Sequence, residues 1–285
     1  MNLRTCAPFV VALASSANAA SVYLMSSGDN FTDSAASLAL TSRGHTVTIG
    51  LAHYEFDGSA NLAGFDTVYL QCNYSWTVGA MPLAGQQQLI DWVSSGGRLV
   101  TSEWTTYYTY AGGWFDTLAT IMPAEHSFTY DFQLFTVYSQ VTPDAEINAG
   151  LPPVFDFPLT SFAGTETHTV AKPGATTYYT TSTSVDAAGL VGWSWGAGRV
   201  YSFLSTCGAD QVSDPEFGQL FSNVMGSGSA CYPDCENDGD LDIFDYLCFL
   251  NEFAAPSPYA DCENDGDWDV FDFLCFQGQF ANGCD

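Results

Sequence analysis

The feature that most constrains this chain is a duplication near its C-terminus. Residues 235–254 read CENDGDLDIFDYLCFLNEFA, and residues 262–281 read CENDGDWDVFDFLCFQGQFA. Matching positions lie 27 residues apart, as Cys235 and Cys262 do. A unit this short cannot bury an apolar face by itself, so we expect the two copies to pack against each other.

Each copy has the ligand spacing of a calcium-binding loop. With Gly239 at position six, acidic residues occupy positions one, three, five, seven, nine and twelve, and the second copy repeats this around Gly266. Calcium takes about 6–8 oxygen ligands, and the glycine permits the sharp turn on which they converge. The predicted ligands are Asp234, Glu236, Asp238, Asp240, Asp242, Asp245, Asp261, Glu263, Asp265, Asp267, Asp269 and Asp272. We therefore expect two bound Ca²⁺ ions, and folding that depends on them, because crowded carboxylates repel one another without a cation.

Two details of the loops depart from the common EF-hand pattern. Position twelve is Asp rather than Glu, and no long helix precedes either loop. Both details match dockerin modules, in which a calcium loop followed by one helix occurs twice. Residues 231–285 thus resemble a dockerin of the cysteine-rich kind that ends in Gly-Cys, here Gly283-Cys284. The resemblance implies a protein partner, cohesin-like or another surface anchor, although Ile243-Phe244 and Val270-Phe271 are apolar where cohesin-binding dockerins are often polar.

Two other interpretations of the tail stay open. The tail carries 14 of the 32 acidic residues and no Lys or Arg, a composition that disordered segments share. Against disorder, Phe, Leu and Cys recur at helical spacing after each loop. The other interpretation treats the tail as a sorting signal that is removed after export, which the mass of the mature protein would test.

The first twenty residues have the pattern of an export signal. Arg4 precedes the apolar run CAPFVVALA, and Ala-Asn-Ala or Asn-Ala-Ala offers a cleavage site near residue 19 or 20. The run is shorter than the ~20 apolar residues of a membrane span. We therefore expect a secreted protein, extracellular or attached to the cell surface, with no transmembrane span, and the resemblance to dockerins implies a bacterial one. A formal charge of −27 with five basic residues argues against a nucleic-acid partner.

The cysteines favour an oxidising compartment. Loss of Cys6 with the signal leaves an even number, and six of the nine cysteines lie in the tail without a Cys-x-x-Cys pair. We therefore favour disulfides over metal thiolates. Many pairings exist, and the one that follows the repeat is Cys235–Cys248, Cys262–Cys275 and Cys231–Cys284. Cys72 and Cys207 remain as one bridge or as two buried thiols.

Strand and helix patterns alternate through residues 21–225. The predicted order is strand SVYLMSS, a helix capped by Asn30 or Thr32, strand HTVTIGL, strand FDTVYLQC, a helix over 81–97 and strand RLVTSEW. This order predicts a mainly parallel sheet with helices on both faces. Later we expect a helix around Trp114–Met122, short strands and loops over 127–184, a hairpin in LVGWSWGAGRVYSF and a last helix capped by Ser213. A Gly/Ser linker at 226–230 then precedes the tail.

Four stretches of this domain resemble the class I glutamine amidotransferase-like group. They are RGHTVT, FDTVYL, LIDWVSSGGRLVTSEW and GAGRVYSF. The resemblance implies a flavodoxin-like, doubly wound α/β fold over residues 21–225. Catalytic members of the group carry a Cys on a tight elbow after the strand that matches RLVTSEW, and a His after the last long strand. Here those places hold Ser102-Glu103-Trp104-Thr105 and Thr206-Cys207-Gly208, so we expect the amidotransferase reaction to be absent and lean against an enzyme.

Aromatic residues gather where the predicted parallel strands end, the usual ligand crevice of such sheets. They are Tyr74, Trp76, Trp104, Tyr107 and Tyr108, together with the acidic Glu103. Rings beside a carboxylate suit a glycan, so a glycan-binding or glycan-active domain is the alternative to a non-catalytic one. The structural interpretation is that these rings pack into the core. Glu103 is the only catalytic candidate, without a second carboxylate placed beside it, and it could instead satisfy backbone groups at a helix start.

Overall fold

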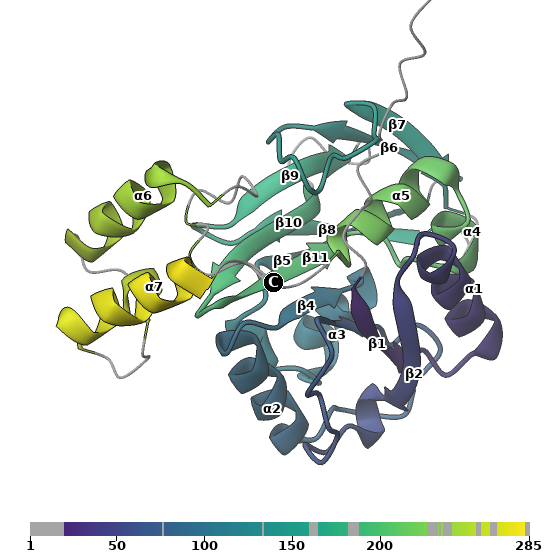
Figure 1. The fold of residues 1–285 in the computed structure, drawn as a ribbon. Helices are drawn as coiled ribbons and strands as arrows, with labels where there is room; N and C mark the ends of the chain where they lie inside the picture. Colours follow the sequence, from purple (N-terminus) through teal and green to yellow (C-terminus); the bar gives the residue numbers. More distant parts are fainter. Residues whose placement is uncertain are drawn as a thin grey trace, which may run out of the picture.

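The computed structural model describes the chain in a series of segments. They are residues 20–75, 77–132, 134–159, 165–181, 188–226, 233, 235, 241–254, 258–262 and 267–282. The predicted signal peptide except Ala20, and most of the predicted linker, therefore lie outside the described residues. Within them, the N-terminal part forms a large sheet with helices on both faces, and the C-terminal part forms a pair of helices (Figure 1). None of the described helices is both long and apolar enough to span a bilayer.

Half of the large sheet is parallel. Five strands stand in the order β2-β1-β3-β4-β11 and run in one direction. They are β1 (Ser21–Ser26), β2 (Thr46–Ala52), β3 (Thr67–Leu70), β4 (Arg98–Thr101) and β11 (Gly198–Phe203). Strands β3 and β4 are buried along their whole length, because helices cover both faces. The predicted flavodoxin-like α/β fold is confirmed.

The same sheet continues beyond β11 as an antiparallel half. From β11 it runs through β10, β9, β6 and β7, and a separate antiparallel pair is formed by β5 and β8. These strands are β5 (Ala124–Phe132), β6 (Phe135–Gln140), β7 (Val154–Pro158), β8 (Thr165–Ala171), β9 (Thr176–Thr181) and β10 (Ala188–Trp195). The predicted hairpin is β10–β11, closed by the pair Trp195 and Gly198. The Thr- and Tyr-rich stretch forms strands because branched and aromatic side chains suit a pleated surface.

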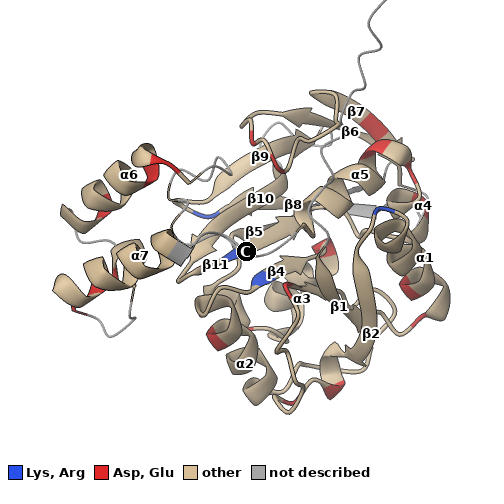
Figure 2. Cartoon of the chain, viewed as in Figure 1, with Lys and Arg blue, Asp and Glu red and all other residues tan. Residues whose placement is uncertain are grey.

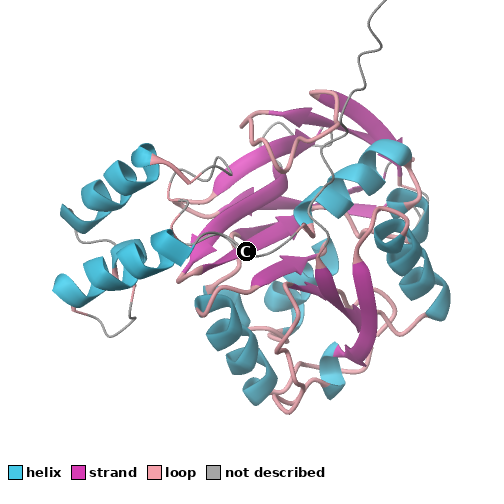
Figure 3. Ribbon diagram, viewed as in Figure 1, coloured by secondary structure: helices cyan, strands magenta, loops and turns pink. Residues whose placement is uncertain are grey.

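Helices cover the two faces of the sheet and make two cores (Figure 3). They are α1 (Asn30–Thr41), α2 (Leu83–Ser94), α3 (Glu103–Gly112), α4 (Ala209–Val212) and α5 (Pro215–Val224), with single turns η1 (His53–Glu55) and η2 (Leu118–Thr120). Alternate residues of β1 face opposite cores. Leu24 packs with α1, α4 and α5, whereas Met25 packs with α2 and the segment after α3.

Two predicted helix caps are wrong by one residue or more. The cap of α1 is Asp29, whose carboxylate accepts a hydrogen bond from the Thr32 amide, instead of Asn30 or Thr32 itself. The cap of α5 is Asp214 instead of Ser213. An ionised carboxylate is the stronger cap, because it both accepts the hydrogen bond and complements the positive end of the helix dipole.

The helix predicted around 114–122 is also wrong. That stretch holds only the turn η2, and the helix lies earlier, as α3. Gly113 ends α3 in the left-handed region, at a φ of 64°. The Thr and Tyr residues of α3 hide it from sequence inspection, because both residue types are more common in strands.

In its described residues, the tail has one helix after each predicted calcium loop. These are α6 (Ile243–Ala254) and α7 (Val270–Asn282), with a turn η4 (Pro258–Ala260) between them. Phe249 and Phe276 are fully buried and stack at 3.9 Å between ring centroids, with Ala260 beside them. The expectation that the two copies pack on each other is confirmed.

Candidate functional site: the duplicated acidic loops

The structure describes half of the twelve predicted calcium ligands. Those outside the described residues are Asp234, Glu236, Asp238, Asp240, Glu263 and Asp265. Those within them are Asp242, Asp245, Asp261, Asp267, Asp269 and Asp272. Among the described residues alone, no three His, Cys, Asp or Glu side chains are placed to hold a metal ion. The predicted ligand set therefore stays a prediction.

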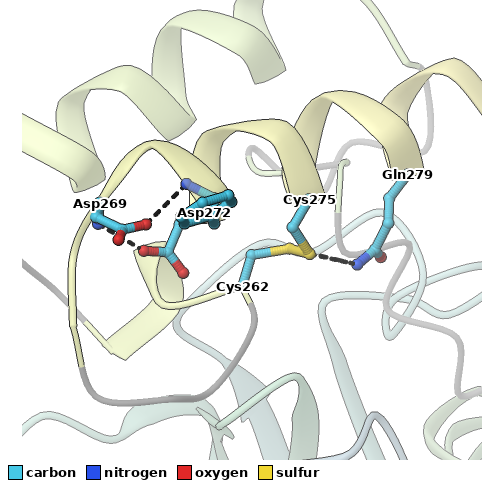
Figure 4. The surroundings of a disulfide bond; sticks show 6 residues. Cys262, Asp269, Asp272, Cys275 and Gln279 are labelled. Carbon is cyan, nitrogen blue, oxygen red and sulfur yellow. Dashed lines mark hydrogen bonds between the residues drawn. A yellow bond between two sulfur atoms is a disulfide. The ribbon is translucent and has the colours of Figure 1, made fainter.

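The last two acidic positions of each loop make the same hydrogen bonds in both copies. In the second copy, Asp272 Oδ2 accepts from the Asp269 amide at 2.9 Å, and Asp269 Oδ1 accepts from the Phe271 amide at 2.7 Å (Figure 4). In the first copy, Asp245 Oδ2 accepts from the Asp242 amide at 2.8 Å. This is a reciprocal capping arrangement, in which the N-cap and the third helical residue each satisfy a backbone N–H. The sequence pattern assigned these residues to calcium alone and missed their second role.

The carboxylates at position twelve are buried. Asp245 and Asp272 are each 1% exposed, and buried carboxylates are found hydrogen-bonded, paired with a positive charge or bound to a metal ion. Residues 231–285 contain no Lys, Arg or His, and Figure 2 shows acidic residues but no basic ones on α6 and α7. An all-oxygen, anionic donor set is what a hard cation such as Ca²⁺ prefers. The residues present fit calcium, which would bring a positive charge that no side chain of residues 231–285 carries.

A disulfide ties each loop to the helix that follows it. Cys235 pairs with Cys248 and Cys262 pairs with Cys275, with Cα–Cα distances of 5.7 and 5.9 Å. Gln279 Nε2 lies 3.4 Å from both sulfur atoms of the second bridge. The two predicted intra-repeat pairs are confirmed, and the predicted Cys231–Cys284 bridge lies outside the described residues.

An apolar row on the outside of the tail is also duplicated. The exposed side chains are Ile243, Phe244 and Leu247 on α6, and Val270, Phe271 and Leu274 on α7. Each member of the first trio has its counterpart 27 residues later. Six large apolar side chains that are each about half exposed are unusual in a segment so small, and such patches mark interaction surfaces.

The second candidate site, at the carboxyl ends of the parallel strands, is filled by protein. Glu103 is 1% exposed, and its amide donates to the Ser205 carbonyl at 3.0 Å. It is the first residue of α3, just after β4. Asn73 Nδ2 donates to the Thr206 carbonyl at 2.9 Å, which ties β3 to the loop after β11.

Both cysteines of the domain are buried and free, so the structure has the two-thiol alternative instead of a bridge. Cys207 has a left-handed backbone conformation, with a φ of 52°, and no other non-glycine residue that the structure describes has a positive φ. Burial, together with the nearby Glu103 carboxylate, raises the pKa of the Cys72 and Cys207 thiols. The thiols therefore stay protonated at neutral pH, where a thiol is a poor nucleophile.

Some of the predicted glycan-stacking residues do come together. Trp104 stacks on Tyr108 at 5.6 Å, and Tyr108 stacks on Trp114 at 4.2 Å with 12° between the rings. Tyr107 turns away to meet His126 edge-on. Trp114 was not among the predicted stacking residues, because it lies in the loop after α3 and not at the end of a strand. Of the other predicted residues, Tyr74 is 48% exposed, and Trp76 lies outside the described residues.

Comparison with known proteins bears on the fold alone. The sequence matches no family model and no curated protein sequence. A ThuA-like protein from Bacteroides uniformis is similar in structure, with a TM-score of 0.53 and 10% identity over 72% of this chain and 88% of that one. A cytoplasmic protein from Salmonella typhimurium has a TM-score of 0.52 and 14% identity, over 72% of this chain and 97% of that one. A β-galactosidase from Rahnella has a TM-score of 0.52 and 16% identity, over 73% of this chain but only 31% of that one. These neighbours support the flavodoxin-like α/β fold expected for the N-terminal part.

Proposed function

We propose that this protein is a secreted, calcium-binding modular protein. Its tail, residues 231–285, acts as a dockerin-like module that binds two Ca²⁺ ions and attaches the chain to a cell-surface or extracellular protein. Its flavodoxin-like domain is displayed and has no catalytic role. The observation that carries the proposal is a duplicated one: Asp245 and Asp272 are buried at the same position of the two acidic loops, and each accepts a hydrogen bond from the amide of the Asp three residues earlier.

The disulfides support this proposal in two ways. They fit an exported protein, because such bonds persist in oxidising compartments. They also hold each acidic loop against its helix, which lowers the conformational entropy that the loop loses when it closes on an ion. Since calcium must bring like charges together, a pre-closed loop favours binding.

The duplicated apolar row supports the attachment function. Exposed apolar side chains on two adjacent helices can anchor a protein partner, while the surrounding carboxylates of the tail favour a partner whose rim is basic. Aromatic anchors contribute most to such interfaces, so Phe244 and Phe271 are the expected centre of contact. Replacing both by Ser should abolish surface attachment while the calcium sites remain.

Calcium titration of the full mature chain tests the central claim. We expect two ions per wild-type chain by calorimetry and one per chain after Asp272→Asn. The matched control is Glu252→Gln, which removes one negative charge from α6 outside the loops and should leave two ions bound. An absence of calcium uptake by the wild-type chain would refute the proposal, as would unchanged uptake by the Asp272 variant.

The second candidate function is glycan binding by the N-terminal domain. It is favoured by the stack of three rings, Trp104, Tyr108 and Trp114, near the strand ends. Burial raises the pKa of Tyr108 to about 12, and the negative charge of Glu103 adds to this shift, so the carboxylate lies near the rings. Binding of soluble polysaccharides should then be lost in Trp104→Ala and kept in the control Trp92→Ala on α2. Hydrolysis that disappears in Glu103→Gln would replace the non-catalytic proposal with an enzymatic one.

A further inference from the structure

The start of β1 is held by a buried histidine. Ala20 is 2% exposed and belongs to the same core as Val22 and Leu24. Its amide donates to Nδ1 of His45 at 3.0 Å, and its carbonyl accepts from the Thr46 amide at 2.9 Å. Ala20 is therefore an integral part of the sheet.

His45 links this first residue to the last helix of the domain. Because a backbone N–H can only donate, Nδ1 is the acceptor and the proton resides on Nε2. Nε2 donates that proton to Ser222 Oγ on α5, at 2.8 Å. The ring of His45 is 4% exposed, so removal of Ala20 would leave Nδ1 buried without its donor, a costly state for a polar atom.

The next residue has a partner of its own. The Ser21 amide donates to Asp66 Oδ2 at 2.6 Å, and the Ser21 carbonyl accepts from the Asp66 amide at 2.8 Å. A chain that started at Ser21 would place its charged amino group against this carboxylate, which is favourable. A chain that starts at Ala20 keeps the hydrogen bond to Asp66 and also keeps the two bonds of Ala20.

We propose that the mature protein begins at Ala20 and that His45 receives its amino group; this inference rests on the proposed export. The sequence offers cleavage after Ala-Asn-Ala, which ends at Ala19, or after Asn-Ala-Ala, which ends at Ala20. Only the first leaves Ala20 in the chain. The first also places small residues, Ala17 and Ala19, at both positions that define such sites, whereas the second places Asn18 at one of them.

The chemistry of the cut fits the receiving site. Water adds across the amide between Ala19 and Ala20, which leaves a carboxylate on the released peptide and an amino group on Ala20. One hydrogen of that amino group takes the place of the amide hydrogen on His45 Nδ1, and a charged donor makes a stronger hydrogen bond than an amide does. Cleavage thus preserves every bond that Ala20 makes in the fold.

Chains with defined starts test this inference without any export step. Full-length proteins beginning at Ala20 or at Ser21 are released from a fusion partner by a protease that leaves no extra residue, and each is made with His45 and with His45→Phe. With His45, we expect loss of Ala20 to lower Tm by about 5 °C. With His45→Phe, the loss should be less than half as large. Equal Tm values for the two starts, or an equal loss in both backgrounds, would overturn the inference.

The exported protein gives an independent measurement if the His45 variants do not fold. Its intact mass should correspond to a chain that begins at Ala20, and a mass one alanine lower would contradict the proposed start. A protein that remains uncleaved inside the cell would overturn the proposed export, while the comparison of defined chains would still decide whether Ala20 and His45 act together.

Discussion

Phe276 is the centre of the small core of the tail, and its truncation to Ala should raise the calcium concentration that the tail needs in order to fold. The ring is fully buried and stacks on Phe249 at 3.9 Å. Replacing such a buried ring by Ala costs about 3–5 kcal/mol. A module of about 55 residues is stable by roughly 3–8 kcal/mol, and a core this small places it near the lower end. The free energy of unfolding of the calcium-free variant should therefore be close to zero.

Calcium should restore the fold of the Phe276→Ala variant. At a free calcium concentration 100 times Kd, each site adds about 2.7 kcal/mol, so two sites add about 5 kcal/mol and offset the lost packing. Limited proteolysis of the full chain, followed by mass spectrometry, measures this directly. We expect cuts within residues 241–282 in chelator, protection in calcium, and an N-terminal domain that stays intact in both.

The matched control is Phe271→Ala on the same helix. Phe271 is 56% exposed, so the same truncation removes little buried surface, and this variant should match the protease resistance of the wild-type chain in calcium and in chelator. A Phe276 variant that resists protease in chelator would refute the reasoning about the core. A variant that stays sensitive in saturating calcium would refute the coupling of metal binding to folding.

Three further predictions concern the N-terminal domain. Glu146→Gln removes the carboxylate that lies 2.9 Å from Nη1 of Arg98, whose side chain is 1% exposed. Because Glu146 itself is 36% exposed, we expect the free energy of unfolding measured in urea to fall by about 1–3 kcal/mol. An unchanged free energy of unfolding would contradict the role of the pair. Cys72 and Cys207 should react with a thiol reagent only in denaturant, since burial raises both thiol pKa values, and rapid reaction of the native protein would show that they are accessible. Burial lowers the pKa of His45, so the unfolded chain takes up the proton at a higher pH than the folded chain does. The contribution of His45 to stability is therefore complete above about pH 6.5 and is lost as pH falls below that value. A Tm that does not decline from pH 7 to pH 5 would refute this.

The parallel half of the fold could be predicted because its signals are local and regular. Buried runs such as FDTVYL and exits such as Gly96-Gly97 mark strand and helix ends without knowledge of the rest of the chain. The antiparallel half could not be ordered, because nothing local in β6 or β9 specifies which strand lies beside it. The pairing of Tyr138 with Thr181, for example, joins residues far apart in sequence.

The site shows the same division. Intra-repeat disulfides followed from the duplication, because a bond that works in one copy must work in the other. The capping role of Asp242 and Asp269 was missed, although it follows from their place just before a helix. The stack of Trp114 on Tyr108 depends on how the loop after α3 returns, which no sequence pattern encodes.

The way in which the domain ends has a mechanical consequence for an anchored protein. The carbonyls of Val224 and Met225 are held by Arg98 Nη1 at 3.0 Å and by Thr67 Oγ1 at 3.2 Å. Both side chains belong to interior strands of the sheet, β4 and β3. A force applied through the tail would therefore be transmitted by these two hydrogen bonds to the interior strands and not to an edge strand. A tethered domain would then stay folded under flow.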